Sequence, residues 1–268
     1  MKRISLAMAL LVALSTPTWA DFKEGLAAYK RGDYETAFRE LLPLAEQGNA
    51  KAQIILGGMY RNGEGVSVDD TKAVRWWRGA AEQGHAKAQV ELGGMYRIGA
   101  GVRQDFTEAV KWFRKAADQG SKGAQHLLGS MYRNGEGVPQ DNAEAVRWWR
   151  RAAEQGAPIA QTALGFMLRV GAGIPRDTAK AAAWLRKAAE KGFSPAQHFL
   201  GGMYENGEGL PQDRVQAHFW YSLSAAQGNV TARRSLEKVA KRMTSAQITE
   251  SQKLKKTTSI QPLKIPIR

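Results

Sequence analysis

The chain has 268 residues, 43% apolar and 24% charged, which excludes an intrinsically disordered protein and allows one or two domains with a sizeable core. Its net charge of +14 indicates an acidic partner, a nucleic acid or an anionic membrane surface. The absence of cysteine excludes a disulfide framework and an acylated lipoprotein, so core packing must hold the fold.

Residues 1–20 are typical of a secretory signal peptide. Lys2 and Arg3 form a positive start, residues 4–14 form an apolar stretch too short to span a bilayer, and Ala20 ends a small-residue cleavage site. We therefore expect cleavage after Ala20 and a periplasmic or secreted protein. The alternative is an uncleaved anchor helix.

Residues 21–47 are predicted to form an N-terminal capping helical hairpin. Asp33 and Ala37 lie 36 residues before Asp69 and Ala73 of the repeats that follow, so we interpret this segment as a degenerate half of a repeat unit. A cap with a more polar outer face is the expected start of a repeat array.

Five units of 36 residues fill residues 48–227. The dipeptide Gln47-Gly48 returns every 36 residues, once as Lys191-Gly192, and a tryptophan keeps the same step. These tryptophans are Trp76, Trp112, Trp148, Trp184 and Trp220. Self-similarity at this period is the signature of stacked helical repeats that bury one continuous core.

Each unit is predicted to contain two helices. In the first unit, Ala52, Leu56 and Tyr60 give a helix over residues 50–61 one apolar face. Glycines in residues 62–65 break this helix, because glycine permits positive φ.

The second helix of the unit is predicted to begin with Asp69 as its N-cap and to end at Gln83-Gly84. Ala73, Trp76 and Ala80 are expected to form its buried stripe. The rigid tryptophan would fill the space between adjacent units.

Polar side chains recur at two further positions with expected structural roles. Glu108 and Glu144 follow an N-cap aspartate by three residues, which is the spacing of a capping box. Gln53 has four copies, and a buried amide must be satisfied, so we expect it to bond to a loop or a neighbouring helix.

The G-x-G loop at residues 63–65 raises the alternative of a phosphate-binding loop. A dinucleotide fingerprint needs a preceding strand and a third glycine. Here a helix precedes the loop, the third glycine is missing and the loop recurs in all five units, so we interpret it as a helix–helix connector.

The pattern A-x-A-Q-x-x-L-G-x-M-Y-x-x-G-x-G-V, followed by D-x-x-x-A-x-x-W and A-A-E-Q-G, resembles the Sel-one-like repeat, a relative of the tetratricopeptide repeat. The fourth unit departs from it where Leu168 replaces the tyrosine. The resemblance implies an all-α, right-handed solenoid that binds other proteins and is usually not an enzyme. Exported bacterial relatives are linked with envelope assembly, signalling, and virulence or secretion.

Residues 228–256 are predicted to form basic C-terminal capping helices, and residues 257–268 a disordered tail. From residue 231 onward there are ten basic residues and two acidic ones, which supplies +8 of the net charge. Thr244 with Gln247 three residues later indicates a helix start.

No catalytic, cofactor or metal site is expected. His126 and His198 occupy one repeat position two units apart, and stacked helices about 10 Å apart would separate them by roughly 20 Å. Metal ligands lie about 2 Å from the ion, so the two histidines cannot share one.

Positions that vary between units indicate the binding surface, because they are free of packing roles. An arginine recurs near the end of the first helix and becomes glutamate in the last unit; such a ladder would grip acidic segments by bidentate pairs. The other interpretation is a solvated face, which we prefer for the second-helix set Arg78, Arg114, Arg150 and Arg186. The candidate binding residues are Arg61, Glu91, Arg97, His126, Arg133, Arg169, His198, Phe199 and Glu205.

The sequence favours a non-enzymatic adaptor of the bacterial envelope that binds a partner protein or peptide, with acidic segments, on the concave face of the solenoid. The alternative is a binder of anionic envelope polymer or lipid through the basic C-terminal segment. Export disfavours a nucleic-acid partner, and no cofactor is expected. The identity of the partner, the pathway and the oligomeric state stay open.

Overall fold

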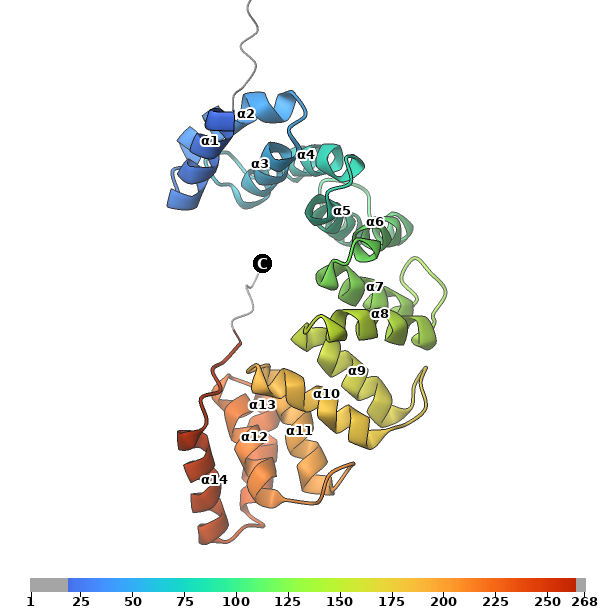
Figure 1. Cartoon of the computed structure of the whole chain (residues 1–268), viewed down its shortest axis with the longest axis vertical. Helices are drawn as coiled ribbons and strands as arrows, with labels where there is room; N and C mark the ends of the chain where they lie inside the picture. Colours follow the sequence, from blue (N-terminus) through green and yellow to red (C-terminus); the bar gives the residue numbers. More distant parts are fainter. Residues whose placement is uncertain (1–18, 264–268) are drawn as a thin grey trace, which may run out of the picture. The chain divides into compact units, whose positions relative to one another are not determined.

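The computed structural model describes residues 19–263, which contain fourteen α-helices and no strand (Figure 1). The two helices of each hairpin pack on each other, which confirms the predicted all-α repeat fold. The predicted signal peptide falls almost entirely on residues 1–18, which lie outside the described residues. Within residues 19–263, no helix is long and apolar enough to cross a membrane.

The chain divides into two units, Met1–Gln83 and Gly84–Arg268. The first contains α1 (Trp19–Arg31), α2 (Tyr34–Glu46), α3 (Ala50–Asn62) and α4 (Asp70–Glu82). The second contains α5 (Ala86–Ile98), α6 (Phe106–Asp118), α7 (Lys122–Asn134), α8 (Asn142–Glu154), α9 (Pro158–Val170), α10 (Thr178–Glu190), α11 (Ser194–Asn206), α12 (Arg214–Ala226), α13 (Val230–Ala240) and α14 (Ser245–Thr257).

The G-x-G loop connects two helices, as predicted. Gly63 ends α3 in the left-handed conformation, with φ of 72°, and Asp69 then caps α4 by accepting from the backbone N–H of Lys72 at 2.9 Å. The backbone N–H of Asp69 donates to the carbonyl of Tyr60 at 2.9 Å and closes the loop. The same cap aspartate begins α6, α8, α10 and α12.

The second glycine of each loop is required by both its backbone angle and its surroundings. Gly173 has φ of +69°, and a Cβ there would lie 2.3 Å from the carbonyl carbon of Asn142 at the start of α8. A side chain at this position would be strained and would also push the loop away from the preceding hairpin.

The buried stripe expected for the second helix of the first unit is confirmed for Ala73 and Ala80 and wrong for its tryptophan. Trp77 is 4% exposed, whereas Trp76 is only half-buried. Residue 77 shares a face with 73 and 81 because four residues make about one helical turn. The ring of Trp77 lies on Gly57, and its indole N–H donates to the carbonyl of Ile54 at 3.2 Å.

The tryptophan that recurs in every unit lies beside this stripe. Trp148 belongs to the cluster formed by α6 and α7, so it does pack between hairpins, as expected. A cation three residues later lies over the same kind of ring: Lys115 Nζ is 4.2 Å from the centre of Trp112, and the guanidinium carbon of Arg151 is 4.6 Å from that of Trp148. The half-buried ring of Trp112 and the buried ring of Trp148 therefore combine apolar packing with a cation–π contact.

The predicted capping boxes form at only one of the three expected places. Thr244 and Gln247 make both bonds of the box at the start of α14, at 3.3 and 2.9 Å. Glu108 instead pairs with Lys111 at 2.6 Å. Glu144 likewise pairs with Arg147 at 3.0 Å, because a lysine or arginine one turn further on competes for the carboxylate.

Glutamines form hydrogen bonds both within a hairpin and to the preceding helix, which confirms the role expected for Gln53. Its amide nitrogen donates to the carbonyl of Ala45 at 3.1 Å, and its oxygen accepts from Gln83 Nε2 at 3.2 Å. Gln155 and Gln227 bond in the same way to Gln125 and Gln197. Each joint thus satisfies a buried amide at both ends.

One of these glutamine joints, between α9 and the end of α10, lacks a hydrogen bond. Lys191 stands where the other units have glutamine, and its Nζ donates to the carbonyl of Gly156 at 2.7 Å. The buried Oε1 of Gln161 therefore has no hydrogen-bond partner among the described residues. A buried acceptor without a partner costs stability.

The C-terminal helices cap the second unit. Both α13 and α14 pack on α12, and Nδ1 of buried His218 lies 2.8 Å from the hydroxyl of buried Ser251. Residues 258–263 form no helix, but Ile260 and Leu263 pack against the cluster of α9 to α11, and the Leu263 N–H donates to the Gly192 carbonyl at 3.2 Å. The rest of the tail predicted to be disordered, 264–268, lies outside the described residues.

Replacing Gly173 by alanine is expected to lower the free energy of unfolding by about 1–3 kcal/mol, the cost of a strained backbone position. The matched control is Gly94→Ala in α5, where a Cβ meets nothing within 4 Å; this change should be neutral or stabilising by up to about 1 kcal/mol. Thermal melts followed by circular dichroism measure both. Equal effects of the two substitutions would contradict the role given to the second loop glycine.

Replacing Lys191 by glutamine is expected to raise the free energy of unfolding by about 1 kcal/mol, because the new amide can reach Gln161 Oε1. The reciprocal change, Gln155→Lys, removes the donor to Gln125 and should destabilise by a similar amount. Urea unfolding of the two variants tests the pair, and a destabilised Lys191→Gln protein would refute the explanation.

Acidification is expected to weaken the docking of α14. Burial and then the charge of Lys255 lower the pKa of His218 below its ordinary value of 6.5. A depressed folded-state pKa means that the contribution of this histidine is complete above pH 6.5 and is lost as the pH falls below it. Melting temperatures at pH 7.5 and 5 should therefore differ more for the natural protein than for His218→Gln, which keeps a hydrogen-bonding side chain but does not titrate.

Candidate binding groove on the first helices

The first helices of three successive hairpins in the second unit, α7, α9 and α11, form a groove. The cavity has a volume of about 450 Å³. Aromatic and aliphatic side chains dominate its walls, together with a few polar groups. The lining residues used below are His126, Arg133, Trp149, Ile159, Phe166 and Phe199.

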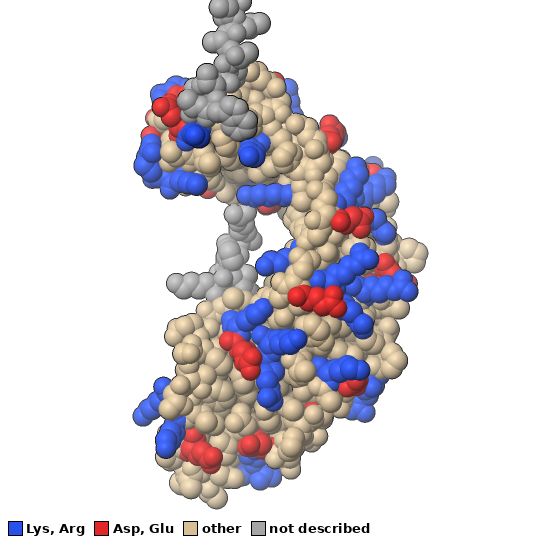
Figure 2. Space-filling view, viewed as in Figure 1, with Lys and Arg blue, Asp and Glu red and all other residues tan. Residues whose placement is uncertain are grey.

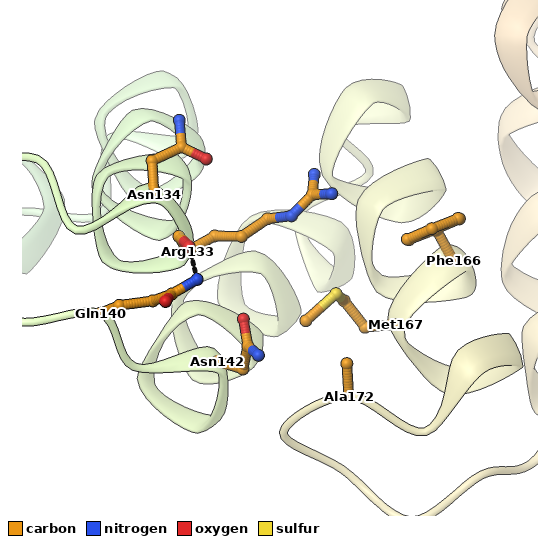
Figure 3. A pocket seen from close by; sticks show the side chains of 7 residues that line it. All are labelled: Arg133, Asn134, Gln140, Asn142, Phe166, Met167 and Ala172. Carbon is orange, nitrogen blue, oxygen red and sulfur yellow. Dashed lines mark hydrogen bonds between the residues drawn. The ribbon is translucent and has the colours of Figure 1, made fainter.

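A second hollow of about 560 Å³ continues from this groove and shares Arg133, Phe166 and Met167 with it. Figure 3 shows the guanidinium of Arg133 extending from α7 toward the ring of Phe166 on α9. The guanidinium carbon lies 5.7 Å from the ring centre, and Gln140 Nε2 donates to the carbonyl of Arg133 at 2.8 Å. Arg133 therefore lies where the two hollows meet.

The arginine ladder is not uniform. Arg61 pairs with Asp70 at 2.7 Å, and Arg169 pairs with Glu208 at 2.6 Å. The bond from Arg169 is the main cause of the lowered pKa of Glu208. These two arginines thus hold the local fold together rather than facing an open surface.

Arg133 differs from these members of the ladder. Its side chain is exposed and, within residues 19–263, forms no ion pair or side-chain hydrogen bond. The contact with Phe166 leaves its N–H groups available. A guanidinium in this state can bind a carboxylate with two parallel bonds.

The floor of the groove is largely apolar because its histidine is half-buried beside an indole. The ring of His126 stacks on Trp149 with centres 6.4 Å apart, and burial lowers the pKa of His126. The indole N–H of Trp149 donates to the backbone carbonyl of His126 at 3.1 Å, which fixes α8 against α7. The neutral imidazole therefore adds no charge beneath Arg133.

The remaining predicted residues lie apart from the groove lining. Burial also lowers the pKa of His198, whose ring centre lies 5.6 Å from that of Tyr221. Glu205 accepts from the Tyr221 hydroxyl at 2.9 Å and from Arg242 at 3.3 Å, so it connects α11 to α12 and to the turn between α13 and α14. Glu91 and Arg97 belong to α5 and line none of the hollows described.

Of the nine predicted residues, the structure brings together His126, Arg133 and Phe199. Sequence reasoning missed Phe166, whose ring lies 5.9 Å from Phe199, and Ile159, which is 40% exposed. The equivalents of Phe166 are glycine or serine, so a large ring at a position that is otherwise small was the available signal.

The groove can bind an apolar side chain whose neighbour carries a carboxylate. Its walls offer Phe166, Phe199 and Trp149 as large rigid surfaces, and Arg133 offers the charge at the rim. Among residues 19–263 there is no cluster of three or more histidine or acidic residues that could hold a metal ion.

Comparison with known proteins agrees with this architecture. A family model for the Sel1 repeat matches residues 50–85, 86–121, 123–156, 158–193 and 194–229. Among curated protein sequences, none matches this chain.

Two solved structures are similar. One is a protective antigen of uropathogenic Escherichia coli strains with an SLR fold: identity is 37% and the TM-score 0.80, over 87% of this chain and 51% of the antigen. The other is a Sel1 repeat protein from Oxalobacter formigenes: identity is 35% and the TM-score 0.77, over 88% of this chain and 99% of that one. The chain thus spans about half the length of the first structure and nearly all of the second.

Proposed function

We propose, because the chain belongs to the Sel1 repeat family, that it is a non-enzymatic adaptor that holds a segment of a partner protein in the groove over α7, α9 and α11. The Sel1-repeat fold is commonly a protein-interaction scaffold. The observation that carries the proposal is the free guanidinium of Arg133 above an aromatic floor.

The chemistry of the groove defines the segment that fits it. An aliphatic or aromatic side chain would pack against the pair formed by Phe166 and Phe199, whose ring centres lie 5.9 Å apart and whose rings therefore contact each other. A carboxylate beside it would reach Arg133. Buried aromatic anchors with one arginine are the usual energetic centre of a protein interface.

Long-range charge supports an acidic partner. The net charge is +14, and on the face of the second unit seen in Figure 2 basic side chains are more widespread than acidic ones. Such a surface speeds the encounter with an acidic protein, while the groove supplies the selectivity.

The proposed compartment is the bacterial envelope. Support comes from the signal-like residues 1–20 and from a cysteine-free chain, which needs no disulfide control in an oxidising compartment. A fusion of residues 1–40 to a periplasm-dependent reporter tests this independently of the groove; retention of the reporter in the cytoplasm would refute it.

The groove is tested by site-specific photocrosslinking at Ser130, one of its lining residues, in living cells. We expect one dominant adduct with a protein that carries an acidic segment. Phe166→Gly, which restores the residue found in three other units, and Arg133→Glu should each reduce the adduct about tenfold or more, as expected for an interface anchor.

The matched control is Arg233→Glu on α13, which changes the net charge equally at an exposed position outside the groove. It should leave the adduct nearly unchanged. If Arg233→Glu reduces capture as much as Arg133→Glu, generic attraction to an anionic polymer through the basic surface explains the binding, and the groove proposal is wrong.

A further inference from the structure

In two places, a second-helix arginine binds the tyrosine of the next first helix, eighteen residues further along the chain. Arg114 of α6 donates to the Tyr132 hydroxyl, and its guanidinium carbon lies 5.7 Å from the ring centre. Arg186 of α10 donates to the Tyr204 hydroxyl at 2.5 Å and lies 5.8 Å from that ring centre. These bonds show that Arg114 and Arg186 are not merely solvated, which corrects the interpretation from sequence.

The equivalent contact between α8 and α9 lacks the tyrosine. Leu168 stands in its place, and Arg150, the equivalent of Arg114 and Arg186, is exposed and forms no hydrogen bond or ion pair within the described residues. A hollow of about 340 Å³ lies at this joint, with Arg150 at its edge.

The lining of this hollow, named here the Arg150 pocket, combines an apolar wall with charged side chains, among them Glu154, Arg176 and Lys180. Leu164 and Leu168 come from α9, Ile174 from the following loop and Trp184 from α10. One face of Trp184 already holds Lys187, whose Nζ lies 4.3 Å from the ring centre.

The repeat equivalents of these walls surround a tyrosine elsewhere in the chain. Tyr132 and Val138 pack against the cluster that contains Leu128 and Trp148. Tyr204 likewise packs with the residues equivalent to that set, Leu200, Leu210 and Trp220. The apolar side chains at the Arg150 pocket are therefore equivalent to those that surround Tyr132 and Tyr204, but no phenol ring lies among them.

We propose that the Arg150 pocket binds the phenol side chain of a tyrosine presented by a partner protein. The ring would pack on the end of the Leu168 side chain and against Ile174, toward the place that the outer part of the ring takes in Tyr132 and Tyr204, and its hydroxyl would accept a hydrogen bond from Arg150. A carboxylate alone would leave the apolar wall unfilled. Two acids line the pocket, Asp177 and Glu154, and neither forms an ion pair with Arg150 within the described residues; Asp177 is engaged as the N-cap of α10 and with Lys180 at 3.0 Å.

This site is separate from the groove. None of the residues that line the Arg150 pocket lines the cavity that contains Phe166 and Phe199. A step of two residues along α9 changes the direction of the side chain by about 200°, so Phe166 and Leu168 project from opposite sides of the helix. A failure of either proposal therefore leaves the other intact.

The test uses the full chain with labelled leucine and isoleucine methyl groups and N-acetyl-L-tyrosinamide as the probe. We expect saturable NMR shifts confined to methyls of Leu164, Leu168 and Ile174. N-acetyl-L-phenylalaninamide, which lacks the hydroxyl, should bind about threefold to tenfold more weakly, the range for one lost hydrogen bond. Arg150→Gln should reduce that discrimination.

Two variants at one position make the result decisive. Leu168→Tyr supplies the ring internally and should abolish the shifts while raising the melting temperature. Leu168→Met keeps an apolar wall without a ring and should preserve binding. Absence of saturable shifts, or equal shifts in the Leu168→Tyr protein, would overturn the proposal. Binding of free 4-methylphenol more than tenfold tighter than the tyrosinamide would overturn the assignment to a partner protein.

Discussion

Every hairpin depends on a glycine of the first helix that lies directly beneath a large side chain of the second helix. A Cβ on Gly57 would lie 2.4 Å from the indole nitrogen of Trp77, and one on Gly129 would lie 2.7 Å from that of Trp149. The large residue changes from unit to unit, since Phe113 and Leu185 fill the same place on Gly93 and Gly165. What stays constant is thus the glycine, because its lack of a side chain lets the two helices approach closely enough to exclude water.

This constraint also determines where binding surface can arise. With one side of each first helix committed to the glycine contact and its glutamine bonded to the preceding helix, only the remaining positions are free to vary. The fourth unit uses that freedom most: Phe166 replaces a small residue, and Leu168 replaces a tyrosine. Both hollows discussed above border α9, one on each side of it. The same helix therefore departs furthest from the shared pattern and supports both proposed contacts.

The sequence predicted the fold well because its strongest signals are local and repeated. A cap aspartate and a left-handed glycine act within a few residues, so Asp69 and Gly63 could be assigned without tertiary information. The tryptophan of the first unit's buried stripe was misplaced because Trp76 and Trp77 are adjacent, and periodicity alone does not decide which of two neighbouring rings faces the core. The groove was predicted only in part, since the pairing of Arg61 and Arg169 with acids depends on distances between side chains that spacing does not reveal.

The incomplete glutamine joint between α9 and the end of α10 has a mechanical meaning. A solenoid behaves as a row of coupled elements, in which each joint contributes its own free energy. With Gln161 lacking one bond, separation at this joint costs less than at the joints of Gln125 and Gln197. Under tension or heat, the second unit should therefore begin to unfold beside α9, the helix that borders both proposed binding sites. A bound partner segment would then also stabilise the part of the unit that separates most easily.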